Sequence, residues 1–472
     1  METVTDKFLI EKFKKLFQSE IKNICSLLKK WLEKWEQLDE EENSQERKKI
    51  FDDLIGLCSK IYPDLINLAC KHFILEEPVH FGKVKISNLE ILIDSKQFIQ
   101  ALKKEQEFSF ETSDYKRDNI IHQFRVFLLG AYLLSDEKIV EWIWQEVLNF
   151  FQGTIREKLK KLNKKEIVFA IWGLASLFHD CGRGIQSFYK NYKQTKECFE
   201  KIFQTFKLPM PDINADVQLN TLWETKKKSF FTLLEYFLTK KEAKWSAYYQ
   251  DIKKVLEDAL KEPKHGIISA FLITFPQAEK LVPTLEKLGS QPKASETLDS
   301  GENFKQLGTA TIFLQQASPV LKIIQTALPI YAALAVAFHD IEEYWFVTHL
   351  TTLLILCDNL QEWKRLTKLG DQATMIFPCE NIALEPQKDK IKIIANIFYS
   401  SKGKHGLEQE IFKRWNPKTK WGGFKEKIRG KIATTMFEQL YDRKNDLHAK
   451  ITIQWEKQQN SNQEIIVEIP PR

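Results

Sequence analysis

The residues of this chain that could do chemistry stand at the end of a strongly apolar run. Residues 167–178 contain almost no polar side chain, which is typical of a buried helix. The run leads into His179 and Asp180, and Gly182 and Gly184 follow, where the backbone can turn sharply. Burying an imidazole beside a carboxylate costs on the order of several kcal/mol unless both groups find partners. A divalent metal would satisfy both, because His offers a nitrogen ligand and Asp offers a hard oxygen that can bridge two ions.

Further candidate ligands share this setting, an ionisable side chain on an apolar helix. His339 also ends an apolar run, and Asp340 follows it directly. His122 and His265 each open a predicted helix of apolar character. Asp358 lies within an otherwise apolar stretch, and a buried aspartate without a partner is improbable. His122, His265, His339 and Asp358 are therefore the candidates for the other metal ligands.

Composition and charge predict a folded globular protein. The 472 residues suffice for two or three domains, and 43% hydrophobic with 12% aromatic residues excludes a disordered chain. The formal net charge of +6 is mild over this length and says little about nucleic acid. Seven cysteines without a CxxC pair fit the reducing cytosol. Neither a signal peptide nor a membrane span is expected, since Gln325, Thr326 and Pro329 interrupt the longest apolar run, so we predict a cytoplasmic protein.

Helical periodicity dominates the chain and predicts a mainly α fold in three parts. Residues 1–105 are predicted to form a helical N-terminal domain, which opens with two long amphipathic helices and could bind a protein partner. Residues 106–366 are predicted to form a helical core with a polar insertion over about residues 190–262. Residues 367–472 are expected to form a small α+β module. Its predicted strands cover residues 390–399, 449–455 and 464–469, and its predicted helix covers about residues 423–440.

The order of the candidate ligands resembles that of the HD-domain metal-dependent phosphohydrolase superfamily. That order is His122, His179 with Asp180, His265, His339 and Asp358. The local contexts are similar too, namely His122-x-x-Arg125-Val126 and Leu177-Phe178-His179-Asp180-Cys181-Gly182-Arg183. The resemblance covers about residues 106–366 and implies an HD-type helical core. It implies that the first His, the His-Asp pair and the last Asp bind one ion, while His265 and His339 bind a second ion bridged by Asp180.

Among the branches of this superfamily, the HD nucleases of CRISPR systems and the dinuclear cyclic-nucleotide phosphodiesterases are most similar. The similarity lies in residues 182–188 and 264–270. It implies that metal-activated water hydrolyses a phosphoester bond in a nucleotide, a cyclic nucleotide or a nucleic-acid strand. Besides Asp180, the expected catalytic residues are Arg183 and Lys264, whose charges would stabilise the transition state. The sequence does not distinguish among Mn, Fe, Ni, Co, Mg and Zn. Asp340 is interpreted as a helix cap or as a partner that orients a ligand, although nucleases often have a second His in its place.

Two alternatives use the same residues. A degenerate HD module would bind a nucleotide and signal through its flanking domains without catalysis, and an HD-type diiron oxygenase uses the same ligand order. The complete ligand set favours an enzyme, and the cationic residues beside it favour a phosphate substrate over oxygenase chemistry. Residues 402–431 are rich in Lys and Arg, with interleaved aromatic residues. Such a surface suits a single-stranded nucleic acid, and the alternative is a solvated face.

Overall fold

The structure is a computed structural model, and it divides the chain into two compact units. The first unit contains Met1–Leu68, Ile99–Trp142 and Ile341–Arg472, and the second contains Ala69–Phe98 and Ile143–Asp340. The structure describes residues 2–17, 21–40, 44–70, 79–81, 84–86, 115–117, 119–150, 156–157, 159–183, 186, 227, 230–232, 234–235, 249–259, 264–273, 319–341, 348–360, 365–369, 372–376, 381–387, 390–398, 448–457 and 461–468. The domain boundaries after residues 105 and 366 stay predictions.

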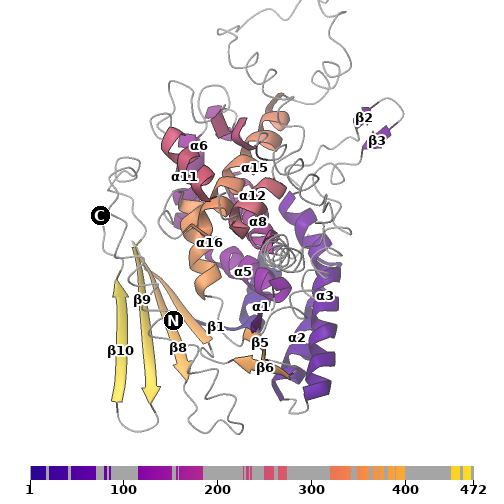
Figure 1. The fold of residues 1–472 in the computed structure, drawn as a ribbon, viewed down its shortest axis with the longest axis vertical. Helices are drawn as coiled ribbons and strands as arrows, with labels where there is room; N and C mark the ends of the chain where they lie inside the picture. The colour runs from indigo at the N-terminus through magenta and orange to yellow at the C-terminus, as the bar shows by residue number, and fades with distance from the viewer. Residues whose placement is uncertain are drawn as a thin grey trace, which may run out of the picture. The chain divides into compact units, whose positions relative to one another are not determined.

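The helices of the first unit are arranged around α5, which is buried along its whole length (Figure 1). They are α1 (Asp6–Leu16), α2 (Cys25–Glu40), α3 (Ser44–Cys70), α5 (Asn119–Leu133) and α16 (His349–Leu360). Both α1 and α16 pack against α5. The long helix predicted at the start of the chain is two helices, because the backbone leaves the helical region at Phe17, where φ is −123° and ψ is 30°.

A buried ion pair fixes α1 to α5. The side chain of Thr5 caps α1 by accepting a hydrogen bond from the amide of Phe8, and Asp6 follows in the first turn. Arg125 donates from Nε and from a terminal nitrogen to the two carboxylate oxygens of Asp6, both at 2.8 Å. The guanidinium carbon of Arg125 also lies 4.1 Å from the ring centroid of Trp35. The N-terminal segment is therefore fastened to α5 by charge and by aromatic contact.

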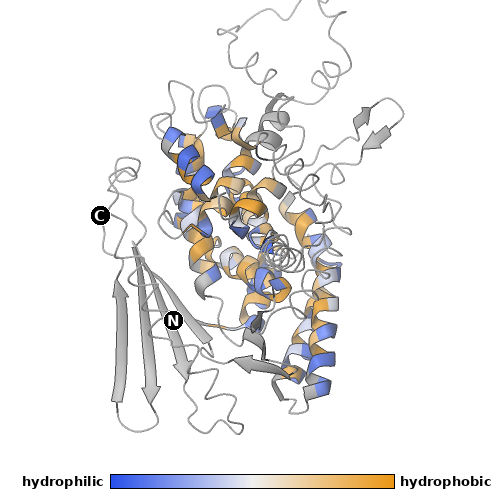
Figure 2. Ribbon diagram, in the orientation of Figure 1, coloured by the Kyte–Doolittle hydropathy of each residue, from blue (hydrophilic) through white to orange (hydrophobic). Residues whose placement is uncertain are grey.

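The second unit is built on three helices whose apolar residues form its core. They are α8 (Lys164–Phe178), α12 (His265–Ile273) and α15 (Pro319–His339), and they contact one another pairwise. Figure 2 shows the hydrophobic character of α8 and α12, in contrast to the mixed surfaces of α2 and α3. Two further helices are α6 (Glu137–Phe150), which runs from the first unit into the second, and α11 (Tyr249–Ala259). On α6, Glu146 accepts a 2.5 Å hydrogen bond from Tyr331 of α15, and both side chains are buried.

The strands in the described part of the chain form three sheets. A five-stranded sheet has the order β1 (Glu2–Val4), β7 (Asn381–Gln387), β8 (Lys390–Phe398), β9 (His448–Lys457) and β10 (Ser461–Glu468), with β8 and β9 parallel and the other pairs antiparallel. An antiparallel three-stranded sheet has the order β4 (Tyr115–Arg117), β5 (Arg365–Leu369) and β6 (Gln372–Ile376). The strands β2 (Val79–Phe81) and β3 (Val84–Ile86) form an antiparallel pair in the second unit.

The predicted mainly α class is confirmed. The strands β8, β9 and β10 lie where three strands were predicted, but the helix predicted over about residues 423–440 lies outside the described residues. The α+β module and the HD-type core therefore stay predictions. Most of the insertion predicted over residues 190–262 and the whole basic stretch of residues 402–431 also lie outside the described residues. Within the described part of the chain, no helix has both the length and the apolar character needed to cross a membrane.

Candidate metal centre

The candidate residues of the second unit stand where three helix ends meet. The end of α8 supplies His179 and Asp180, the start of α12 supplies His265, and the end of α15 supplies His339 and Asp340. The described residues of these helices are apolar where they pack into the core, and this packing brings the polar ends together. The local sequence therefore determines the position of each polar residue on its helix. The packing of the apolar core brings these residues together.

Two glycines allow these ends to approach closely. A Cβ atom on Gly182 would overlap the carbonyl oxygen of His265 and lie 2.7 Å from Cβ of Ile268. The amide of Gly182 also donates a 2.8 Å hydrogen bond to Oγ of Ser269, which ties the turn after α8 to α12. A Cβ atom on Gly266 would lie 2.7 Å from the carbonyl oxygen of Val336. Larger residues at either position would push α12 away from its neighbours.

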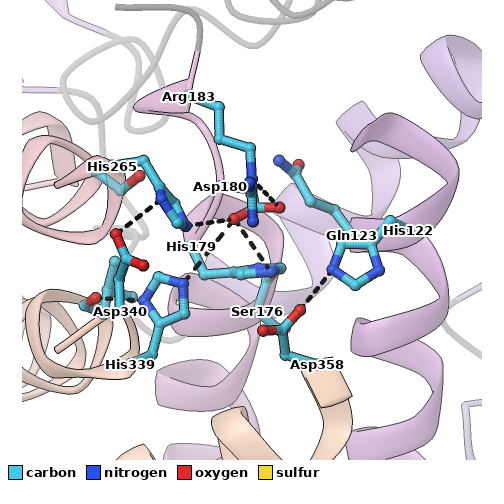
Figure 3. Close-up of polar contacts among 12 residues, drawn as sticks. His122, Gln123, Ser176, His179, Asp180, Arg183, His265, His339, Asp340 and Asp358 are labelled. Atoms are coloured by element: carbon cyan, nitrogen blue, oxygen red, sulfur yellow. Dashed lines mark hydrogen bonds and ion pairs between the residues drawn. The ribbon is translucent and has the colours of Figure 1, made fainter. Parts of the chain in front are cut away.

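Three imidazoles converge on one carboxylate oxygen at this meeting point (Figure 3). The Nε2 atoms of His179, His265 and His339 lie 3.7, 3.0 and 3.9 Å from Oδ1 of Asp180. His179 and Asp180 are fully buried, and His265 and His339 are each 6% exposed. Three rings around one anionic oxygen, away from bulk water, form the strongest concentration of ligand-type atoms in the described part of the second unit.

For His179 and His339, the hydrogen-bond partner of Nδ1 shows which tautomer is present. Nδ1 of His179 lies 2.8 Å from the carbonyl oxygen of Ser176, and Nδ1 of His339 lies 2.6 Å from that of Val336. Carbonyl oxygens only accept hydrogen bonds, so both Nδ1 atoms carry the proton. In the neutral rings the Nε2 lone pairs then point towards Asp180, which is itself an acceptor. These lone pairs and the anionic oxygen repel one another. A cation bound among these atoms would be coordinated by them, which removes the repulsion.

The charge state of the centre follows from its cations. Burial acts to raise the pKa of the Asp180 carboxyl, but the Arg183 guanidinium and His179, together with the adjacent rings of His265 and His339, hold that pKa well below its usual range. Asp180 is therefore an anion despite its burial. Asp340 behaves similarly, because burial raises its pKa, while the hydrogen bond and charge of His265 together with the charges of His339 and Arg183 outweigh that effect and lower it.

The two predicted catalytic cations lie at the edge of the cluster. Nε of Arg183 lies 2.7 Å from Oδ2 of Asp180, and the Arg183 side chain is 35% exposed. The guanidinium thus contacts the buried carboxylate on one side and reaches solvent on the other. Nζ of Lys264 donates a 3.3 Å hydrogen bond to the carbonyl oxygen of Asp340. Its role towards a phosphate stays a prediction.

The first unit contains two further candidate ligands. Nε2 of His122 on α5 lies 2.6 Å from Oδ1 of Asp358 on α16. His122 is fully buried, and the Asp358 side chain is 23% exposed. The structure thus brings these two predicted residues into direct contact. That they share an ion with His179 and Asp180 stays a prediction.

The residues of the second unit could hold a metal ion. Asp180, His265 and His339 each offer a ligand atom, and these atoms all lie within 4.8 Å of one another. His179 adds a fourth such atom at 3.7 Å from Asp180. The donor set of imidazoles and one carboxylate is a normal one for a divalent transition metal. Which ion binds, and how many, stays a prediction.

One partner at this centre was only partly foreseen in the sequence. Oδ2 of Asp340 lies 2.8 Å from Nδ1 of His265, so this carboxylate holds a candidate ligand from outside the cluster. The sequence places Asp340 directly after His339, but it does not show which histidine the carboxylate contacts.

The comparisons with known proteins found no match. No protein-family model matches the chain, and neither a curated protein nor a solved structure does. The resemblance to the HD-domain superfamily therefore rests on the residues themselves.

Proposed function

We propose that this chain is a metal-dependent phosphohydrolase of the HD-domain type. Its substrate would be a phosphoester bond in a nucleotide, a cyclic nucleotide or a nucleic-acid strand. The observation that carries the proposal is the convergence of three imidazole Nε2 atoms on one oxygen of the buried Asp180. The proposal includes an HD-type core over about residues 106–366, a small α+β module after it and a cytoplasmic location.

The ligand set assigns a role to each buried residue. His179, Asp180, His265 and His339 would hold metal, and Asp180 is suited to bridge two ions because both of its oxygens face cationic or ligand groups. His122 and Asp358 are proposed to complete the ligand set of the ion that His179 and Asp180 also bind. A divalent ion in such a site supplies Lewis acidity and activates water for attack on phosphorus.

The imidazole content bears on which metal is resident. Imidazole nitrogen suits Fe, Ni and Zn, whereas Mg prefers sites made of oxygen ligands and water. Three rings around one carboxylate therefore favour a transition metal over Mg in the second unit. Mn and Co remain within the proposed set.

Arg183 supports a phosphorylated substrate. Its Nε atom contacts Asp180, and its side chain is 35% exposed, so the positive charge of the guanidinium stands between the buried carboxylate and a phosphoryl group that approaches from solvent. Lys264, beside His265, would add a second positive charge, although one of its N–H groups is engaged by Asp340. Both cations would stabilise negative charge that develops on the phosphoryl group.

The experiment uses the full chain stripped of metal with a chelator and reloaded with Mn, Fe, Co, Ni, Zn or Mg in turn. Hydrolysis of bis-p-nitrophenyl phosphate, cyclic nucleotides and single-stranded oligonucleotides is measured for each loaded form. We expect transition-metal-dependent hydrolysis of at least one substrate, and its loss in Asp180→Asn. Full metal occupancy without any hydrolysis would contradict the proposal. Nucleotide binding would then favour the signalling module, and oxygen consumption by the iron form would favour the oxygenase.

A further inference from the structure

The three histidines around Asp180 are not held in the same way. His179 and His339 stand at the ends of α8 and α15, and each Nδ1 lies against a carbonyl oxygen three residues earlier in the same helix. A helix end has such carbonyl groups to offer, because its last C=O groups have no partner within the helix. These two rings are therefore oriented by their own helices.

His265 stands at the opposite kind of position. It is the first residue of α12, so no earlier turn of that helix can supply a carbonyl oxygen to its ring. Its Nδ1 instead lies 2.8 Å from Oδ2 of Asp340, a side chain that follows the end of α15. The Nδ1 atom of His265 therefore has a carboxylate from another element as its hydrogen-bond partner, in place of a carbonyl oxygen from its own helix.

We propose that Asp340 is a positioning residue that sets the tautomer and the ring orientation of His265, which rests on the proposed metal-dependent function. A carboxylate accepts the Nδ1 proton, so the lone pair of the neutral ring is placed on Nε2, which faces Asp180 at 3.0 Å. An anionic partner also makes the ring a more basic ligand than a carbonyl would. His265 is then the most strongly donating imidazole of the three.

The geometry argues against Asp340 as a ligand. Its carboxylate contacts the Nδ1 edge of His265, whereas Asp180 lies at the Nε2 edge of the same ring (Figure 3). The backbone of Asp340 is also held, because Lys264 donates to its carbonyl oxygen. The neighbouring Lys264 and His265 thus fix both the main chain and the side chain of Asp340.

The test compares Asp340→Ala and Asp340→Asn with the wild type and with Asp53→Ala. Asp53 is a matched control, since it forms a 2.9 Å ion pair with Lys34 on the surface of the first unit. Metal affinity is measured by competition with a chromophoric chelator, using Zn²⁺ and Co²⁺. We expect Asp340→Ala to weaken binding by about 10–100-fold, the range for loss of such an outer partner, with the number of bound ions unchanged. Asp340→Asn keeps an acceptor oxygen and should lose less, while Asp53→Ala should match the wild type.

A second readout needs no metal. Nitrogen-15 NMR of the metal-free protein should show Nδ1 of His265 protonated in the wild type. In Asp340→Ala the ring should shift towards the Nε2-protonated form, because the Asp180 carboxylate still faces Nε2 at 3.0 Å. Unchanged affinity together with an unchanged tautomer would overturn the inference, and so would loss of a whole ion, because Asp340 would then be a ligand. If Asp340→Ala does not fold, Asp340→Asn carries the same test. If the wild type binds no metal, the proposed function is wrong. The NMR readout would still decide the role of Asp340.

Discussion

Arg183 joins the buried anion of the centre to solvent, so its removal should separate catalysis from metal binding. Nε of Arg183 contacts Asp180 at 2.7 Å, and the rest of the group is partly exposed. We expect Arg183→Ala to lower kcat/KM by about 100-fold, the usual loss for one transition-state donor, while metal content stays near that of the wild type. Arg183→Lys should recover only part of the activity, because it keeps the charge but not the planar fork. Equal loss of metal and activity would show that Arg183 only supports the ligand.

His349 should make the stability of the first unit depend on pH. Its ring stacks on Trp142 at a centroid distance of 3.8 Å, its Nδ1 contacts the Trp142 carbonyl at 3.0 Å, and burial lowers its pKa to about 3. The folded protein therefore keeps His349 neutral, while the unfolded chain binds a proton below its normal pKa of about 6.5. Stability from this group is present above that value and is lost as the pH falls towards 3.

The measurement is urea unfolding of the wild type and His349→Phe from about pH 7 to about pH 4. The wild type should lose on the order of 1–3 kcal/mol relative to the variant over this range, less than the full shift implies because the ring is partly exposed. A difference in unfolding free energy that stays constant with pH would contradict the burial of a neutral His349.

At the scale of elements, the ion pair between α1 and α5 should behave as a buried one. Arg125 is fully buried and Asp6 is 4% exposed, so removal of one partner leaves a charge without compensation. We expect Arg125→Met to lower the free energy of unfolding by roughly 3–5 kcal/mol. The double variant Asp6→Leu with Arg125→Met should recover much of that loss, because no lone charge remains. Urea unfolding of the two single variants and the double variant checks this, and additive losses would argue against a coupled pair.

The close approach of α12 and α15 should depend on Gly266. A Cβ atom there would lie 2.7 Å from the carbonyl oxygen of Val336 and 2.9 Å from Nδ1 of His339, which are partners in one hydrogen bond. We expect Gly266→Ala to cost about 1–3 kcal/mol of stability and to weaken metal binding. Gly56→Ala is the matched control, since nothing lies within 4 Å of a Cβ atom at that position of α3.

The control should move in the opposite direction. Gly56→Ala places a better helix former inside a helix and should stabilise the protein by roughly 0.5–1 kcal/mol. Thermal unfolding and chelator competition measure both effects. A Gly266→Ala variant with normal stability and normal metal affinity would mean that the two helix ends are not tightly packed.

The places of His179, His265 and His339 were predictable, because each stands where an apolar helix begins or ends, a pattern that is visible in the sequence. The link from His265 to Asp340 was not, because it depends on two helix ends that meet only in the folded core. The break between α1 and α2 was also missed. Apolar spacing continues through Ile21 and Ile24, both buried, so periodicity gave no sign that the helix ends at Leu16.

At the scale of the whole molecule, the candidate ligands lie in both units. The second unit contains four of them, grouped around Asp180, and the first unit contains the pair of His122 and Asp358. Helical periodicity was enough to predict the mainly α class, since long apolar stretches leave few other ways to bury a core. It could not define the sheets, whose order depends on pairing between distant segments such as β1 and β7.

The central claim is that the cluster around Asp180 holds metal, and metal content tests it most directly. The wild type, Asp180→Ala and Asp53→Ala are loaded with Zn²⁺ or Mn²⁺, desalted and analysed by inductively coupled plasma mass spectrometry, with circular dichroism to verify folding. The account predicts that the wild type and Asp53→Ala retain stoichiometric metal and that folded Asp180→Ala loses it, because three imidazoles no longer share an anionic oxygen. A folded Asp180→Ala protein that retains the full metal content of the wild type would contradict the account.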